Sequence, residues 1–213
     1  MEENIVIFGA HSDDEILGMG GTILKYALEG NNVYTIILSY GEGASPWLRK
    51  QALVKDRIKE TQEVSNFLGS KESIILGLPD GKLQEYITKP IVKKKIKELI
   101  RKYNPTKIFV TSSLDPHFDH RAVNTIVLEI LEEIDKKKKI SVFTYEVWNV
   151  ITEHKPRLYI DITPHFKKKI QALKMFESQR HYIYPLLIPV YYRSLISGLH
   201  HGCRYAERFY KVR

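Results

Sequence analysis

Short apolar runs alternate with amphipathic stretches along most of the chain. The apolar residues of Ile5–Phe8 and of Lys107–Thr111 are contiguous rather than alternating with polar ones. Contiguous apolarity is typical of a parallel strand that is covered on both faces of its sheet. Between such runs the apolar residues recur at helical spacing, and in His120–Ile134 they define one buried face.

This alternation predicts a mostly parallel α/β sheet with right-handed connections. The predicted strands are Ile5–Phe8, Val33–Ser39, Ser73–Leu76, Lys107–Thr111, Ile140–Val147 and Arg157–Ile162. The predicted helices run from the first acidic loop to about Leu28 and over Leu48–Leu68, Lys89–Tyr103, His120–Ile134 and Pro164–Ser178. Gly69 is expected to cap the second helix. The residues after Ser178 show no comparable pattern.

Two acidic, histidine-containing stretches follow the two contiguous apolar runs. Gly9–Glu15 reads Gly-Ala-His-Ser-Asp-Asp-Glu, and Asp115–His120 reads Asp-Pro-His-Phe-Asp-His. In open α/β sheets, reactive groups collect beyond the carboxyl ends of the strands. We therefore expect both stretches on the same rim of the sheet, although they lie far apart in the chain.

Three of these residues, His11, Asp14 and His120, form a candidate metal site. His11 and Asp14 are three residues apart at a strand-to-helix turn, so both side chains can reach one point, and His120 arrives from the neighbouring loop. Two imidazoles and one carboxylate leave the fourth position of a tetrahedral zinc ion open for water. We expect one catalytic Zn²⁺ per chain, and Fe²⁺, which uses the same ligand set, is the alternative.

Neighbouring residues are candidates for acid–base chemistry. Asp13, beside Asp14, is expected to accept the proton of a metal-bound water. His117 is expected to stabilise an oxyanion or to protonate a departing nitrogen, and Asp119 to orient His117 and keep its pKa high. These parts fit the attack of water on an acyl carbon. A simpler alternative for Asp14 is the capping of a helix start.

Three stretches resemble the signature blocks of the LmbE-like (PIG-L) zinc-dependent N-deacetylases: Ala10–Glu15, Gly18–Thr22 and Pro116–Ala122. Weaker similarity to the family is found at Arg57 with Glu60, Leu78–Gly81, Lys169–Gln179 and Gly202–Phe209. The resemblance thus covers nearly the whole chain in the order of the family.

The resemblance implies a Rossmann-like fold and hydrolysis of an N-acetyl group, usually from an N-acetylglucosamine unit. It assigns by position the metal ligands His11, Asp14 and His120, the base Asp13 and the assisting residues His117 and Asp119. The family usually has proline where this chain has Ser12 and Phe118. Because a prolyl ring supplies no chemistry, we expect altered loop rigidity or pocket shape rather than loss of the metal.

Two further residues are candidate substrate contacts. Arg57 lies where the family has its Arg-x-x-Glu pattern, and pairing with Glu60 or another carboxylate inside the fold is an equally good interpretation. Phe118 is expected to shape the acyl pocket. The expected substrate is a small amino sugar or its conjugate: free N-acetylglucosamine, a chito-oligosaccharide, or a glucosaminyl-inositol or glucosaminyl-malate type compound.

Composition limits these interpretations. A chain of 213 residues, 43% hydrophobic and 27% charged, fits one globular domain over residues 1–213. Cys203 is the only cysteine, so an intrachain disulfide is impossible and a reducing compartment is expected. The N-terminus lacks the pattern of a signal peptide, and Tyr182–Tyr192 is too short to span a bilayer. These observations predict a cytoplasmic protein without a membrane span.

Charge and the tyrosine-rich tail leave other classes open. The chain carries 33 Lys and Arg against 25 Asp and Glu, a net charge of +8, but its lysine runs lack interleaved aromatics, so no nucleic-acid partner is expected. A two-metal phosphoesterase and a basic nucleotide-binding module are the alternatives to a deacetylase. The tyrosines of Tyr182–Tyr192 are expected in the core or in a contact of a homo-oligomer rather than on a sugar. His200 and His201 are candidates for the mouth of the site.

Overall fold

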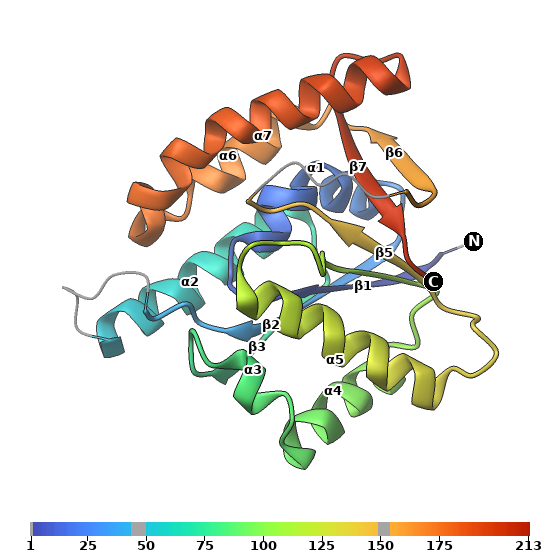
Figure 1. Cartoon of the computed structure of the whole chain (residues 1–213). Coiled ribbons are helices and arrows are strands. Elements are labelled where there is room, and N and C mark those ends of the chain that lie inside the picture. Colours follow the sequence, from blue (N-terminus) through green and yellow to red (C-terminus); the bar gives the residue numbers. More distant parts are fainter. Residues whose placement is uncertain (1, 44–49, 149–153) are drawn as a thin grey trace.

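The structure is a computed structural model, and it describes the placement of residues 2–43, 50–148 and 154–213 (Figure 1). The strands are β1 (Asn4–Gly9), β2 (Asn32–Ser39), β3 (Glu72–Leu78), β4 (Lys107–Thr111), β5 (Ser141–Tyr145), β6 (Arg157–Asp161) and β7 (Ala206–Lys211). The helices are α1 (Asp14–Leu28), α2 (Lys50–Leu68), α3 (Leu83–Tyr86), α4 (Pro90–Tyr103), α5 (Phe118–Ile134), α6 (Phe166–Lys174) and α7 (Arg180–His201), with a 3₁₀ turn, η1, at Glu177–Gln179.

The strands form a single seven-stranded sheet in the order β3-β2-β1-β4-β5-β7-β6. The first five in that order are parallel to one another, and β7 runs antiparallel to both of its neighbours. The sheet is therefore mostly parallel, as the sequence predicts, with an antiparallel edge. Its order reverses between β1 and β4, and in sheets of this type ligands bind beyond the carboxyl ends of the two strands at that reversal.

Helices cover both faces of the sheet, which explains the contiguous apolar runs. On one face α1, α2, α6 and α7 pack over Ile5 and Ile7, and on the other α3, α4 and α5 pack over Val6 and Phe8 (Figure 1). All four of these β1 side chains are fully buried. Because successive side chains of a strand point to opposite faces, a strand between two helical layers needs an apolar residue at every position.

The predicted elements are confirmed over most of the chain. The strand Lys107–Thr111 has the predicted bounds, and Gly69 follows α2 in the left-handed region with a φ of +78°. None of the helices within residues 2–43, 50–148 and 154–213 has the length and apolarity that a bilayer crossing requires.

Several predicted bounds are wrong. The helix predicted over Pro164–Ser178 is α6 alone, and the chain then continues through η1. The strand predicted over Ile140–Val147 is shorter, and α5 begins at Phe118 rather than at His120. The sequence also failed to predict α3 and α7. The helix α7 contains Pro185 and Pro189, which argued against a helix, yet it packs along β7 with Ile183 and Val190 buried.

Candidate active site

Loops that follow β1, β3 and β4 meet at the carboxyl edge of the sheet. The β1–α1 loop carries His11, the turn after β3 carries Asp80, and the β4–α5 loop carries Asp115 and His117. The loops touch directly, since Nε2 of His11 lies 3.0 Å from Oδ1 of Asp80. The shared rim predicted from the two motifs is therefore present, and it includes a third loop.

His11, Asp14 and His120 converge on one point. Their ligand atoms all lie within 4.8 Å of one another. Nδ1 of His11 is 3.7 Å from Oδ2 of Asp14, and Nε2 of His120 is 3.2 Å from Oδ1 of Asp14. The backbone N–H groups of Ala10 and His11 donate to Oδ2 of Asp14 at 2.9 Å each, which fixes this carboxylate and leaves Oδ1 facing His120.

The second nitrogen of each imidazole faces carboxylates. Nε2 of His11 lies 3.0 Å from Asp80 and 3.4 Å from Asp119, and Nδ1 of His120 lies 3.0 Å from Oδ1 of Asp115. Metal-binding histidines usually donate their other ring N–H to a carboxylate, which fixes the tautomer and makes the ligating nitrogen more basic. The arrangement leaves Nδ1 of His11 and Nε2 of His120 for an ion.

Two observations test whether these residues fit a metal ion. His120 is fully buried, yet its Nε2, the nitrogen that faces Asp14, makes no hydrogen bond. A buried polar atom without a partner is costly unless another group satisfies it. The donor set of two imidazole nitrogens and one carboxylate is also the one that catalytic zinc sites use. The residues therefore fit a divalent metal ion.

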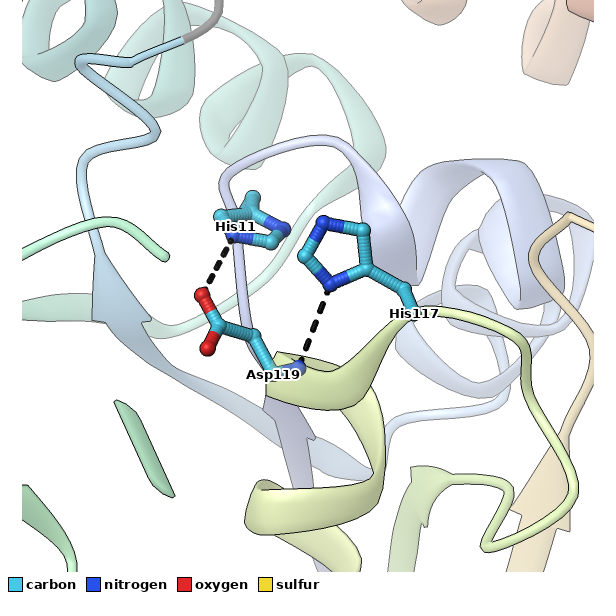
Figure 2. Close-up of side chains that lie close together, drawn as sticks. All are labelled: His11, His117 and Asp119. Carbon is cyan, nitrogen blue, oxygen red and sulfur yellow. Dashed lines mark hydrogen bonds and ion pairs between the residues drawn. The ribbon is translucent and has the colours of Figure 1, made fainter. Parts of the chain in front are cut away.

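A second group of ligand atoms comes from His11, His117 and Asp119 (Figure 2). Its members are already occupied. The carboxylate of Asp119 accepts the N–H groups of Gly81 at 2.8 Å and Leu83 at 3.1 Å, and Nδ1 of His117 accepts the N–H of Asp119 at 3.2 Å. This second group is therefore the poorer metal site.

The electrostatics of the cluster favour a cation. Burial disfavours charge on His11, but contacts with Asp119, Asp80 and Asp14 outweigh it and raise the pKa of His11 to about 10. Burial is likewise outweighed at His120, where Asp14 and Asp115 raise the pKa to about 9. The carboxylates thus favour positive charge at this point. A bound metal ion would supply that charge in place of the protons on the two imidazoles.

Asp13 lies beside the cluster and contacts Arg57. Oδ2 of Asp13 is 3.6 Å from Nη1 of Arg57, which also donates to Oγ of Ser12 at 3.3 Å. Burial raises the pKa of Asp13, while Arg57 opposes that shift. A general base benefits from a pKa raised in this way. The arginine itself is held by close packing, because a Cβ at Gly41, which has a φ of +70°, would lie 2.6 Å from Nη2 of Arg57.

Arg57 pairs with another carboxylate inside the fold, Asp13, and not with Glu60. Both carboxylate oxygens of Glu60 are engaged by Ser178, through its backbone N–H at 2.7 Å and its hydroxyl at 2.6 Å. Arg57 instead faces Asp13 and lines the cavity described below. The interpretation of Arg57 as a pocket residue therefore remains a prediction with geometric support.

The role expected for Asp119 is supported only in part. Its carboxylate accepts backbone N–H groups at the start of α3 rather than a bond from the ring of His117. Burial, His120 and His11 lower the pKa of His117, and the charge of Asp119 opposes that shift, as expected. The contact between the two residues runs through the backbone N–H of Asp119 (Figure 2). Because Nδ1 of His117 accepts this bond, the proton of the neutral ring is on Nε2.

A cavity of about 340 Å³ opens beside the cluster. Its polar lining comes from His11, Asp13, Asp14, Arg57, Asp80, His117 and Gln179, and its apolar lining from Leu17, Trp148, Tyr182 and Leu186. Pockets for small ligands are of this size and combine apolar walls with a few polar groups.

Two expectations about residues around the cavity change, and a third stays a prediction. Phe118 stacks on the ring of His117, a residue of the cavity lining, with centroids 5.0 Å apart, and its expected effect on the shape of the acyl pocket stays a prediction. Tyr182 is 39% exposed and lines the cavity, so it is not a core residue. His201 stacks on Tyr159 of β6 at the far end of α7, away from the cavity mouth.

The sequence interpretation missed Asp80, Asp115 and the cavity residues of the C-terminal region. Asp80 directly follows the β3 strand and Asp115 opens the second motif, so both lay on the predicted rim but had received no role. Their position after a strand was the available signal. Tyr182 and Leu186 gave no such signal, because they belong to α7, which was not predicted, and Gln179 was marked only by the family similarity of Lys169–Gln179.

The chain is similar to a known protein family and to proteins named as deacetylases. The profile of the PIG-L family, described as GlcNAc-PI de-N-acetylase, matches residues 6–131. The chain is 27% identical over 192 residues to a probable N-acetyl-alpha-D-glucosaminyl L-malate deacetylase 2 of Bacillus anthracis, covering 84% of this chain and 82% of that protein. It is also 27% identical over 221 residues to the diacetylchitobiose deacetylase of Thermococcus kodakarensis, covering 96% and 81% of the two chains.

Solved structures agree on the fold. The N,N'-diacetylchitobiose deacetylase of Pyrococcus horikoshii matches with a TM-score of 0.81 at 24% identity, covering 98% of this chain and 83% of that one. A conserved protein of Thermus thermophilus matches with a TM-score of 0.84 at 23% identity, covering 99% and 95%. Because the family profile spans more than half of the chain, this protein belongs to the PIG-L family.

Proposed function

We propose that the protein is a zinc-dependent N-deacetylase that removes the acetyl group from an N-acetylglucosamine-type amino sugar or its conjugate. One observation carries the proposal: ligand atoms of His11, Asp14 and His120 lie within 4.8 Å of one another beside a cavity, while Nε2 of His11, Oδ2 of Asp14 and Nδ1 of His120 face other groups. These three residues are the proposed ligands, one ion per chain.

A zinc ion held by His11, Asp14 and His120 would act as a Lewis acid toward the amide carbonyl and would lower the pKa of the attacking water. Asp13 accepts a proton from the attacking water at its carboxylate, which lies within the cavity lining. His117 donates a hydrogen bond from Nε2 to the developing oxyanion, and Asp13 passes the proton that it took from water to the departing amine nitrogen as the C–N bond breaks. The carboxylates of Asp80 and Asp119 hold the ring of His11, and Asp115 holds that of His120.

The choice of zinc rests on the donor atoms. Imidazole nitrogen suits zinc better than the oxygen-preferring Mg²⁺ or Ca²⁺. Fe²⁺ accepts the same three ligands, so the metal content of protein purified under controlled supply decides between the two ions.

The relatives support an amino-sugar substrate. The Bacillus protein is named for a glucosaminyl malate and the Thermococcus protein for diacetylchitobiose. The fold alone carries no such information, because a 4-carboxy-2-hydroxymuconate hydratase of Pseudomonas putida shares it with a TM-score of 0.75 at 18% identity. Arg57, buried beside Asp13 at the cavity wall, is the proposed hydrogen-bond donor to the sugar.

The proposal is tested by measuring acetate release by the zinc-loaded protein. The substrates are N-acetylglucosamine, diacetylchitobiose and N-acetylglucosaminyl malate. Chelation is expected to abolish release, and added Zn²⁺ to restore it. The variant Asp13→Ala is expected to keep its zinc and lose about 10²- to 10⁴-fold in kcat, the usual contribution of a general base. The control Asp56→Ala removes an exposed carboxylate next to Arg57 and should retain full activity.

The outcomes separate the alternatives. Full activity of the zinc-bound Asp13→Ala variant would remove Asp13 from the mechanism. Two metal ions per chain together with phosphoester hydrolysis would replace the deacetylase by a two-metal phosphoesterase, whose ions lie about 3.5–4 Å apart.

A further inference from the structure

A buried ion pair lies behind the candidate active site and has no part in the mechanism above. Nζ of Lys169, on α6, is 2.6 Å from Oε1 of Glu207, on β7, and both side chains are only 2% exposed. Burial lowers the pKa of Lys169, and the charge of Glu207 opposes that shift. Desolvating two charges is costly and often contributes little net stability, so such a pair calls for a specific role.

The carboxylate of Glu207 closes a break in α1. At Met19 the backbone leaves the helical region, with a φ of −147° and a ψ of 22°. The N–H groups that follow a break lack partners within the helix. Oε1 of Glu207 accepts the N–H of Gly21 at 3.1 Å, and Oε2 accepts the N–H of Thr22 at 2.7 Å. Glu207 therefore caps the second part of α1, where a negative charge is favoured.

The ammonium group of Lys169 closes the other side of the break. It donates to the backbone carbonyl of Leu17 at 2.9 Å, a group that the break deprives of its helical partner. The N–H of Leu17 in turn donates to the backbone carbonyl of Asp13 at 2.9 Å. Two hydrogen bonds thus connect the ion pair to the residue proposed as the base.

The first turn of α1 carries much of the proposed chemistry. Asp13 precedes it, Asp14 opens it, and both of them and Leu17 line the cavity. Gly18 lets this turn pass close to β5, because a Cβ there would lie 2.3 Å from Cδ2 of Tyr145. Since the break separates this turn from the rest of α1, the longer part of the helix does not by itself fix its orientation.

We propose that Lys169 and Glu207 are positioning residues, which bind the two sides of the break in α1 and thereby fix the turn that carries Asp13 and Asp14. The expected fall in kcat for acetate release rests on the proposed deacetylase function. It adds that the metal ligand and base of the N-terminal half depend on two residues from the C-terminal third of the chain, more than a hundred and fifty positions away.

The test compares Lys169→Met and Glu207→Gln with the wild type at a temperature well below the unfolding transition of every variant. Two readouts are needed: the zinc Kd, measured by competition with a chromogenic chelator, and kcat and KM for acetate release. We expect zinc affinity and kcat each to fall by about tenfold, the lower end of the effect of groups that orient metal ligands, with KM within about twofold. Lys169→Arg, which keeps the charge and the donors, should restore most of both.

The matched control is Arg213→Met. It breaks another buried ion pair, between Nη1 of Arg213 and Oδ2 of Asp135, also 2.6 Å long and with Arg213 only 3% exposed. This pair lies at the end of α5 remote from the cavity. The control should lower the melting temperature while leaving zinc affinity and kcat unchanged, which separates loss of position from loss of stability.

Each outcome decides the proposal. Zinc Kd and kcat within about twofold of wild type in folded Lys169→Met and Glu207→Gln would overturn it. If these variants do not fold, Glu207→Asp replaces them, and an unchanged zinc Kd and kcat in that variant likewise overturns the proposal. If the wild type itself binds no zinc and releases no acetate, the deacetylase function fails instead, and amide exchange at Gly21 and Thr22 then tests the anchor: faster exchange in Glu207→Asp supports it, and unchanged exchange overturns it.

Discussion

The two walls of the cavity are built in different ways. One wall carries His11 and Asp80 on loops that directly follow strands and Asp14 at the start of α1, with polar atoms fixed by backbone N–H groups and neighbouring carboxylates. The other wall carries Trp148 and Tyr182, which are 41% and 39% exposed. The first wall is buried and hydrogen-bonded, and the second is apolar and open to solvent.

The difference suggests that the first wall carries out the reaction and the second wall contacts the substrate. A metal centre needs its ligands held within narrow limits of distance and direction, which buried loops between strands provide. A surface that contacts a sugar needs area and shape, which exposed aromatic rings provide. Substitutions in the first wall should therefore reduce metal binding and turnover, whereas substitutions in the second should change substrate affinity alone.

The largest effect is expected from removing a metal ligand. His120→Ala should lose bound zinc and reduce kcat/KM by about 10³-fold or more, because several kcal/mol of transition-state stabilisation disappear and each 1.36 kcal/mol is a factor of ten. Metal analysis of the purified variant, together with acetate release, measures both losses. His200→Ala, which alters an exposed histidine at the end of α7, is the control and should behave as wild type. A His120→Ala variant that retains stoichiometric zinc would remove His120 from the ligand set.

An intermediate effect on zinc affinity is expected from changing a residue that contacts a metal ligand. Asp115→Asn keeps the shape of the side chain beside Nδ1 of His120 but removes the charge that fixes the tautomer of the ring. Zinc affinity should fall by about 10- to 100-fold, with a smaller loss of kcat at saturating zinc. Competition with a chelator gives the affinity, and Asp161→Asn, a carboxylate at the end of β6, is the control. Equal zinc affinity in wild type and Asp115→Asn would show that this carboxylate does not support the ligand.

The sequence predicted the residues of the first wall better than those of the second. His11 and His120 were found because each belongs to a motif that follows a contiguous apolar strand, and this pattern is local. The position of the Asp119 carboxylate was not predictable, because its partners are the free N–H groups of Gly81 and Leu83 beside α3, a one-turn helix that the pattern did not show.

The second wall depends on α7, and here local rules point the wrong way. Pro185 and Pro189 each remove a backbone donor and normally end a helix. Packing against β7 outweighs this cost, with Ile183 and Val190 fully or almost fully buried. Tertiary packing of this kind involves residues distant in sequence, so neither the helix nor its contribution of Tyr182 to the cavity could be predicted from the segment itself.

The smallest effect is expected at Tyr182, the open side of the cavity. Tyr182→Ala should raise KM for an N-acetylated disaccharide by about threefold to tenfold while kcat and zinc content stay unchanged, because the ring contributes contact area of modest worth and no chemistry. Tyr184→Ala is a matched control, since Tyr184 is a similarly exposed tyrosine of the same helix that does not line the cavity. Steady-state kinetics on the monosaccharide and the disaccharide measure the difference. A fall in kcat at constant KM would place Tyr182 with the reacting groups of the first wall and would break the separation between the two walls.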